Sequence, residues 1–275
     1  MTESKTKVDK SPERVRAMFG EIAPKYDFLN NVLSIGLAKR WRKRLVEEVF
    51  ALLKTRVDPT SPYYVEEEAE VPFGQSYYYY DPIETLDVAT GTGDVVIEER
   101  RQWETLFKEG ETFANELSIL GVDFVPEMLE LARKKAPNER FEEADGTDLP
   151  FESERFDATT IAFGLRNMAN PARGVSEMAR VVRPGGVVAI LEFTPTKFPL
   201  FAPIFRFYFH KILPAIGRRV AKDSTDAYKY LPESVEAFDS KERVLEMMRA
   251  SGISNARAIS LTFGVLALYI GTKDA

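Results

Sequence analysis

The chain has 275 residues, 44% of them hydrophobic, which is enough to bury a complete hydrophobic core. Its formal net charge of -6 argues against a dedicated nucleic-acid binder, because such domains carry a basic surface, and we expect no nucleic-acid partner. The absence of cysteine and the single histidine, His210, exclude disulfides, cysteine-ligated zinc and multi-histidine metal sites, so we expect no metal.

The N-terminal part of the chain, residues 1–57, predicts a polar tail followed by a helical lid. Residues 1–12 are expected to be disordered, and the helical spacing that follows is interrupted at Pro24. The tail lacks the apolar core of a secretory signal, and no apolar run reaches membrane-spanning length, which predicts a cytoplasmic protein. A second helical stretch, Leu37–Leu53, carries a basic cluster made of Lys39, Arg40, Arg42, Lys43 and Arg44.

Residues 58–82 have neither helical nor strand periodicity, so we expect an irregular insertion and assign it no function. From 83 to 275, short apolar runs alternate with helical ones, which is typical of a parallel sheet covered on both faces. The predicted strands are Thr85–Ala89, Leu117–Asp123, Arg140–Glu143, Phe156–Ala162, Gly186–Phe193, Arg257–Thr262 and Leu266–Thr272. The predicted helices between them are Asp94–Phe107, Pro126–Lys135 and Ala172–Val182. The pattern predicts an α/β fold with a doubly wound, mostly parallel, seven-stranded, Rossmann-like sheet, an antiparallel end and an N-terminal helical extension.

A glycine loop, running from Asp87 to Asp94, joins the first predicted strand to a helix. Gly91 and Gly93 would let a ligand approach the backbone, and the helix amides could hold an anion. A dinucleotide-binding loop would place another glycine where this chain has Val96, and the Gly-Lys-Ser/Thr of a phosphate loop is absent. S-adenosylmethionine carries no phosphate and fits such a loop, although a plain tight turn remains the alternative.

Acidic residues follow the next two predicted strands. Asp123, with Phe124 beside it, stands where a carboxylate can accept both ribose hydroxyls of a nucleoside. Asp145, followed by Gly146, could accept from an adenine amino group, although taken alone it is more typical of a cap or turn. Together with the glycine loop at the end of the first predicted strand, they make three acidic strand ends in register. This arrangement favours a cofactor site over separate caps.

Three strings carry a family resemblance: Met18-Phe19 to Asn30 around Tyr26-Asp27, then Gly91-Thr92-Gly93-Asp94, then Phe163-Gly164-Leu165-Arg166-Asn167-Met168. With Arg183-Pro184-Gly185-Gly186 and Glu192-Phe193, they closely resemble the ubiquinone/menaquinone biosynthesis C-methyltransferase family over most of residues 13–274. The resemblance implies a class I methyltransferase fold and methyl transfer from S-adenosylmethionine to a prenylated benzoquinol or naphthoquinol. It also implies cofactor contacts at Thr92, Asp123 and Asp145-Gly146. The family commonly has serine before Phe163, so Ala162 here implies a contact without its hydroxyl.

Carbon methylation requires an oriented ring and the loss of a proton. Arg166 and Asn167 are candidates for stabilising a phenolate or holding a water, with a structural ion pair as the alternative for Arg166. His210 is a further candidate base, although a packed histidine is more common there. Tyr26 could belong to a lid or to a structural cap. The remaining candidates, for the base or for substrate contact, are Asp226, Tyr228, Tyr230, Phe205 and Phe209.

The segment 198–240 is expected to form a helical substrate or membrane segment, because it is aromatic-rich, broken by prolines and flanked by basic residues. A buried helical layer is the alternative. We expect peripheral association with a membrane surface, with a homodimer as one option for assembly. Competing functions are a methyltransferase for another small lipid and a non-catalytic adenosine-binding subunit of a quinone-biosynthesis assembly. A nicotinamide oxidoreductase is the weakest alternative.

Overall fold

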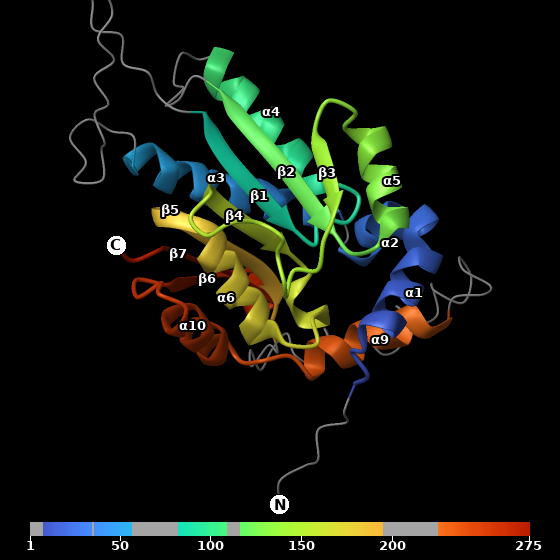
Figure 1. Ribbon diagram of the computed structural model, residues 1–275. Helices are drawn as coiled ribbons and strands as arrows, with labels where there is room; N and C mark the ends of the chain where they lie inside the picture. Colours follow the sequence, from blue (N-terminus) through green and yellow to red (C-terminus); the bar gives the residue numbers. More distant parts are fainter. Residues whose placement is uncertain (1–7, 35, 57–81, 109–115, 195–224) are drawn as a thin grey trace, which may run out of the picture.

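The structure is a computed structural model that describes residues 8–34, 36–56, 82–108, 116–194 and 225–275 (Figure 1). Within these ranges, one seven-stranded sheet has the order β3-β2-β1-β4-β5-β7-β6. The first five strands in the chain pair in parallel, whereas β7 is antiparallel to both β5 and β6. The strands are β1 (Ile83–Val88), β2 (Leu117–Asp123), β3 (Arg140–Glu143), β4 (Phe156–Ala162), β5 (Val182–Phe193), β6 (Arg257–Leu261) and β7 (Leu266–Thr272). The predicted mostly parallel sheet with an antiparallel end is confirmed.

The predicted start of β5 at Gly186 is wrong, because the strand begins at Val182. Phe156 of β4 pairs with Val182, and the next pair along β4 is Ala158 with Val187, so β5 contains an irregularity in its register. The residues between these two pairs include Pro184, which lacks the amide needed for regular pairing. The string Arg183-Pro184-Gly185-Gly186, which resembles a turn, therefore lies inside β5 instead of before it.

Helices cover both faces of the sheet and its carboxyl edge (Figure 1). Helices α3, α4 and α5 share one apolar core with the sheet, which includes Trp41 and Trp103. Helices α6 and α10 enclose the other core, which includes Phe156 and Phe238. Helices α1, α2 and α9 lie near the carboxyl ends of the parallel strands. The helices are α1 (Pro12–Ile22), α2 (Tyr26–Leu33), α3 (Ala38–Arg56), α4 (Asp94–Lys108), α5 (Pro126–Lys135), α6 (Pro171–Val181), α9 (Thr225–Glu236) and α10 (Lys241–Ala250), with short 3-10 turns η1 (Ala23–Lys25), η2 (Leu165–Asn167) and η4 (Thr262–Gly264).

The N-terminal helices form a cap whose first helix begins at Pro12, where the helical spacing of the sequence starts. Residues 8–11, which precede it, are described and have no helix or strand. The Asp9 carboxylate accepts from the amide of Ser11 at 2.9 Å, and helix α1 starts with Pro12, whose fixed φ suits a first helical position. Pro24 lies in the 3-10 turn η1 between α1 and α2, as the predicted interruption requires. Residues 1–7 lie outside the described residues.

Two predicted regions lie largely outside the described residues. All of the predicted insertion at 58–82 except Pro82, and residues 198–224 of the segment 198–240, lie outside the described residues. Across the ranges that the structure does describe, no helix is both long enough and apolar enough to cross a membrane.

Candidate active site

The glycine loop after β1 requires a backbone that most residues avoid. Ala89, Gly91 and Gly93 have φ values of 52°, 57° and 81°, in the left-handed region that favours glycine. A side chain at Gly93 would begin 3.1 Å from the Phe141 ring, so the loop packs too closely there for any other residue. A side chain at Gly91 would begin 3.7 Å from the Tyr26 ring. The loop therefore leaves its backbone open toward the cap.

Asp123 joins this loop to the end of β2. Its carboxylate accepts from the amide of Gly91 at 2.8 Å and from the amide of Val125 at 2.9 Å. The side chain is buried, and burial raises its pKa to about 6, while the amides of Val125 and Gly91 favour the charged form. The carboxylate is thus fixed at the strand end by two backbone donors.

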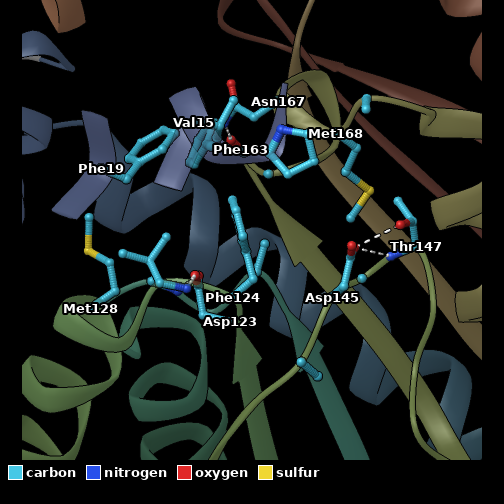
Figure 2. A pocket seen from close by; sticks show the side chains of 18 of the residues that line it. Val15, Phe19, Asp123, Phe124, Met128, Asp145, Thr147, Phe163, Asn167 and Met168 are labelled. Carbon is cyan, nitrogen blue, oxygen red and sulfur yellow. Dashed lines mark hydrogen bonds between the residues drawn. The ribbon is translucent and has the colours of Figure 1, made fainter. Parts of the chain in front are cut away.

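Asp145 lies at the next strand end and also lines the pocket (Figure 2). Its Oδ1 accepts from the amide and the hydroxyl of Thr147, both at 2.8 Å, so the turn that the sequence left as an alternative is present. The following Gly146 packs so closely that a side chain there would begin 2.6 Å from Cε of Met168. A side chain at Gly174 of α6 would likewise collide with Sδ of Met168. Met168 therefore occupies a slot between two glycines at the pocket wall.

The pocket between these strand ends and the cap encloses about 820 Å³ of space between protein atoms, part of it open to solvent. Asp123 and Asp145 lie on one side in Figure 2, with Phe163 and Asn167 across from them. Predicted contacts Phe124, Gly91, Gly146, Ala162 and Tyr26 also line it. Lining residues that the sequence reasoning missed are Lys10, Val15, Phe19, Met128 and Met168.

A smaller hollow of about 350 Å³ adjoins the pocket and shares Tyr26, Gly91 and Ala162 with it. Asp87 lines this hollow and accepts from the hydroxyl of Thr160 at 2.8 Å, while its Oδ2 has no hydrogen-bond partner among the described residues. Burial raises the pKa of Asp87 to about 7. Arg42 lines the hollow as well. The Asp87 carboxylate could bind the ammonium group of an amino acid, and the Arg42 guanidinium could bind its carboxylate.

The basic cluster predicted at Lys39–Arg44 does not form a single patch. Lys39 and Arg40 are exposed, whereas Arg42 turns toward the glycine loop and pairs with Asp94 at 2.9 Å. Lys43 and Arg44 pair with acids one turn further along the same helix. The sequence missed Arg42 as a site residue because helical spacing alone does not say which basic side chain faces the loop.

Thr92 connects the loop to the cap. Its hydroxyl donates to Asp27 of α2 at 2.6 Å and accepts from the Lys135 ammonium at 3.0 Å. Lys135 also bonds the other oxygen of Asp27 at 2.9 Å. We call Asp27, Thr92 and Lys135 the latch. The hydroxyl of Thr92, predicted as a cofactor contact, is engaged within the protein.

Arg166 and Asn167 lie on η2, but only Asn167 lines the pocket. The Arg166 guanidinium pairs with Glu192 of β5 at 2.8 Å and donates to the carbonyl of Phe163 at 2.6 Å. Both charged side chains are buried. Phe163, with a φ of 62°, also accepts from the Asn167 amide at 3.1 Å. The ion pair that the sequence left open for Arg166 is present.

Of the remaining predicted site residues, only Tyr230 has a described side chain, and it does not line the pocket. Tyr230 is buried at 3% exposure, and its hydroxyl has no hydrogen-bond partner among the described residues. The side chains of Asp226 and Tyr228 fall outside the description, as do His210, Phe205 and Phe209. Their predicted roles remain predictions. Among the described residues, no group of acids and histidines could hold a metal ion.

The pocket and the adjoining hollow suit a nucleoside that carries an amino acid and no phosphate. The carboxylates of Asp123 and Asp145 line the pocket, and Asp87 and Arg42 line the hollow. The fold is also that of a solved methyltransferase from Thermotoga maritima, described as S-adenosylmethionine-dependent and a possible histamine N-methyltransferase. That structure matches with a TM-score of 0.57 and 14% identity, covering 94% of this chain and 100% of that one. The fold is thus that of the class I S-adenosylmethionine-dependent methyltransferases.

The family follows from the sequence. Residues 5–273 match the model of the ubiE/COQ5 methyltransferase family, and the chain belongs to this family. It is 41% identical to the demethylmenaquinone methyltransferase of Deinococcus radiodurans, covering 95% of this chain and 93% of that protein. It is 39% identical to the ubiquinone/menaquinone biosynthesis C-methyltransferase UbiE of Geobacter sp. strain M21, covering 95% and 97%. The protein is thus a C-methyltransferase.

Proposed function

We propose that the protein transfers a methyl group from S-adenosylmethionine to a ring carbon of a prenylated quinol, of the benzoquinol or naphthoquinol type. One observation carries the proposal: the pocket leads from the acids at the strand ends to an apolar, aromatic wall that includes Val15, Phe19 and Phe163. Such a wall suits a planar ring with few polar groups. The names of the two relatives, which refer to menaquinone and ubiquinone, support the same substrate class.

We propose that the cofactor lies along the carboxyl edge of the sheet. Asp123 would accept from the ribose hydroxyls, and Asp145, Gly146 and Phe124 would enclose the adenine. Gly91 and Gly93 would allow the cofactor to approach the loop backbone, with Thr92 and Ala162 at its sides. The ammonium would meet the unpartnered oxygen of Asp87, and the carboxylate would meet Arg42, which we add to the predicted site.

The chemistry then depends on how the protein places the ring. S-adenosylmethionine supplies an electrophilic methyl group, and the ring must lose a proton before or during attack. Asn167 lines the pocket, so its side chain can contact a ring hydroxyl directly. Arg166 lies behind it in the ion pair with Glu192, where its charge would stabilise a developing phenolate through the pocket wall. His210 and Tyr230 remain candidates for a base or substrate contact.

We also propose that α1 and α2, the first two helices of the predicted N-terminal region 1–57, act as a lid over the core at 83–275, with Tyr26 as the residue that closes on cofactor and ring. Helix α3 of the same region belongs to the core, because it packs against the sheet. The latch between Asp27, Thr92 and Lys135 supports this division, because it ties α2 to the glycine loop by side chains alone. Phe205 and Phe209 would guide the prenyl tail.

The tail of a prenylated quinol dissolves in a bilayer, so we propose peripheral association with an anionic membrane surface. Exposed apolar and basic side chains support it: Phe28 is 54% exposed, and Lys39 and Arg40 are exposed on α3. Flotation with anionic liposomes at low and high salt tests the association. A homodimer is a separate option, tested by light scattering.

The activity is tested with the purified protein and methyl-labelled S-adenosylmethionine on a panel of acceptors. We expect methylation of a prenylated naphthoquinol or benzoquinol that lacks the ring methyl, and none of a sterol or a phospholipid base. Cells without the protein should accumulate the demethyl quinone in mass spectra. Tight cofactor binding without turnover of any quinol would instead favour a non-catalytic subunit.

A further inference from the structure

Lys10 is a charged side chain for which the activity described so far has no use. It lies just before α1 in the stretch held by the capping contact between Asp9 and Ser11, and it lines the pocket together with Asn167. The side chain is partly buried, and its ammonium makes no hydrogen bond or ion pair within 4.0 Å with any described residue. Among the described residues, this pocket-lining cation therefore has no ion-paired or hydrogen-bonded partner.

The neighbours of Lys10 also leave polar atoms unpaired. Buried atoms without a hydrogen-bond partner among the described residues include Oδ1 of Asn167, Nε of Arg166 and the hydroxyl of Tyr230. These residues belong together in space, because α9, which carries Tyr230, packs against both η2 and α1. Of these three residues only Asn167 lines the pocket, and because buried polar groups are nearly always satisfied in native proteins, its unpaired oxygen points to a polar ligand there.

The charges around Lys10 favour an anion as this ligand. Burial lowers the pKa of Lys10, Asp239 raises it, Arg166 lowers it and Glu192 raises it, yet neither described acid forms an ion pair with the ammonium. Elsewhere the pocket wall is acidic, at Asp123 and Asp145, or apolar. An anionic oxygen at the Lys10 end would be the natural complement, and its attraction to the ammonium is strengthened by the apolar surroundings.

We propose that Lys10 binds the ionised ring hydroxyl of the acceptor and holds it beside Asn167 during methyl transfer. This rests on the proposed function. The hydroxyl gives its proton to water, and the resulting phenolate oxygen pairs with the ammonium. The activated ring carbon then bonds to the methyl carbon as the carbon–sulfur bond breaks, its electron pair passing to sulfur. Loss of the proton from that ring carbon restores the aromatic phenolate, and return of a proton to its oxygen gives the methylated quinol, with S-adenosylhomocysteine as the other product.

The experiment measures binding of two naphthoquinones to the full chain in the presence of S-adenosylhomocysteine. One probe is 2-hydroxy-1,4-naphthoquinone, which is an anion at neutral pH, and the other is the neutral 1,4-naphthoquinone. We expect the wild-type protein to prefer the anion and Lys10→Met to weaken anion binding by about tenfold or more, as for a charged hydrogen bond. Binding of the neutral probe should not change, and Lys10→Arg should keep most of the preference for the anion.

Lys134→Met, at an exposed position on α5, is the matched control and should bind both probes as the wild type does. Melting temperature and affinity for S-adenosylhomocysteine report whether each variant is folded, and Lys10→Gln replaces Lys10→Met if that variant is not. Equal weakening of both probes, an unchanged affinity for the anion, or no anion preference in the wild type would overturn the proposal. Methylation of quinols is scored separately, so a Lys10-dependent anion site without quinol turnover would reject only the proposed function.

Discussion

The two sides of the pocket are built by different forces. On the sheet side, Asp123 is buried and held by backbone amides, and Asp87 is buried beneath the loop. On the cap side, a small apolar cluster joins Ala23 to Val125 and Met128, and the remaining ties are side-chain pairs such as Arg16 with Glu143 at 2.8 Å, both about half exposed. Exposed pairs contribute roughly 0–1 kcal/mol each, whereas buried polar groups are costly to disturb. We therefore expect the sheet side to be formed before the cofactor arrives and the cap to be the side that opens.

The largest effect is expected from a buried ion pair on the sheet side of the pocket. Arg166→Met leaves the Glu192 carboxylate buried without its partner, and we expect it to lower the free energy of unfolding by about 3–5 kcal/mol. Urea unfolding measures the loss. The double variant Arg166→Met/Glu192→Met removes both charges and should regain much of the stability. If turnover stays low in that stable double variant, the Arg166 charge also serves the reaction, whereas unchanged stability in the single variant would contradict the buried-pair argument.

A smaller effect tests whether Asp123 is the preformed cofactor contact. Asp123→Asn should weaken S-adenosylmethionine binding by about 1.5–3 kcal/mol, because the ribose hydroxyls would lose a charged acceptor. Because burial raises the pKa of this acid to about 6, wild-type affinity should fall as the pH drops through that value, and the variant should keep only the part of the fall that comes from Asp87, whose pKa is raised to about 7. Calorimetry measures both. Asp148→Asn, at a side chain that is 89% exposed, is the control, and equal losses in the two variants would reject the assignment.

A further effect is expected from Glu99, a buried acid of α4 behind the loop. Glu99 is fully buried, accepts from the Thr85 hydroxyl at 2.6 Å, and has its pKa raised to about 8 by burial. The folded protein therefore keeps a proton that the unfolded chain releases, so stability falls as pH rises from about 4.5 toward 8. The slope contributed by one such group is at most roughly 1.4 kcal/mol per pH unit. Glu99→Gln should flatten the decline in urea unfolding between pH 6 and 8, and an unchanged slope would contradict it.

The smallest effect should come from the cap. Asp27→Ala removes the acid of the latch, and because these pairs are partly exposed we expect less than about 1 kcal/mol in the free energy of unfolding. The cofactor should nevertheless dissociate faster, since the latch holds α2 against the glycine loop. Stopped-flow release of S-adenosylmethionine measures the rate. Glu246→Ala, which breaks an exposed pair on α10, should leave that rate unchanged, and equal rates in both variants would reject the lid.

Much of the sheet could be predicted from the sequence because its signals are local. Alternating apolar runs placed the strands, and the glycines of the loop and the acids Asp123 and Asp145 marked the edge where ligands bind. Arg42 and Lys10 could not be assigned in this way, because the direction of a long side chain depends on how its helix or cap packs. The partner of Arg166 was also hidden, since Glu192 lies 26 positions away and meets it only when β5 pairs with β4.

The slot that holds Met168 between Gly146 and Gly174 has a genetic consequence. Gly174 belongs to α6, yet any side chain there would meet Sδ of Met168 and push that residue toward the pocket. Substitutions at positions 168 and 174 should therefore occur in the same variants. In a selection for altered acceptor preference, a larger residue at 174 should appear with a shorter one at 168, and each should suppress the defect of the other.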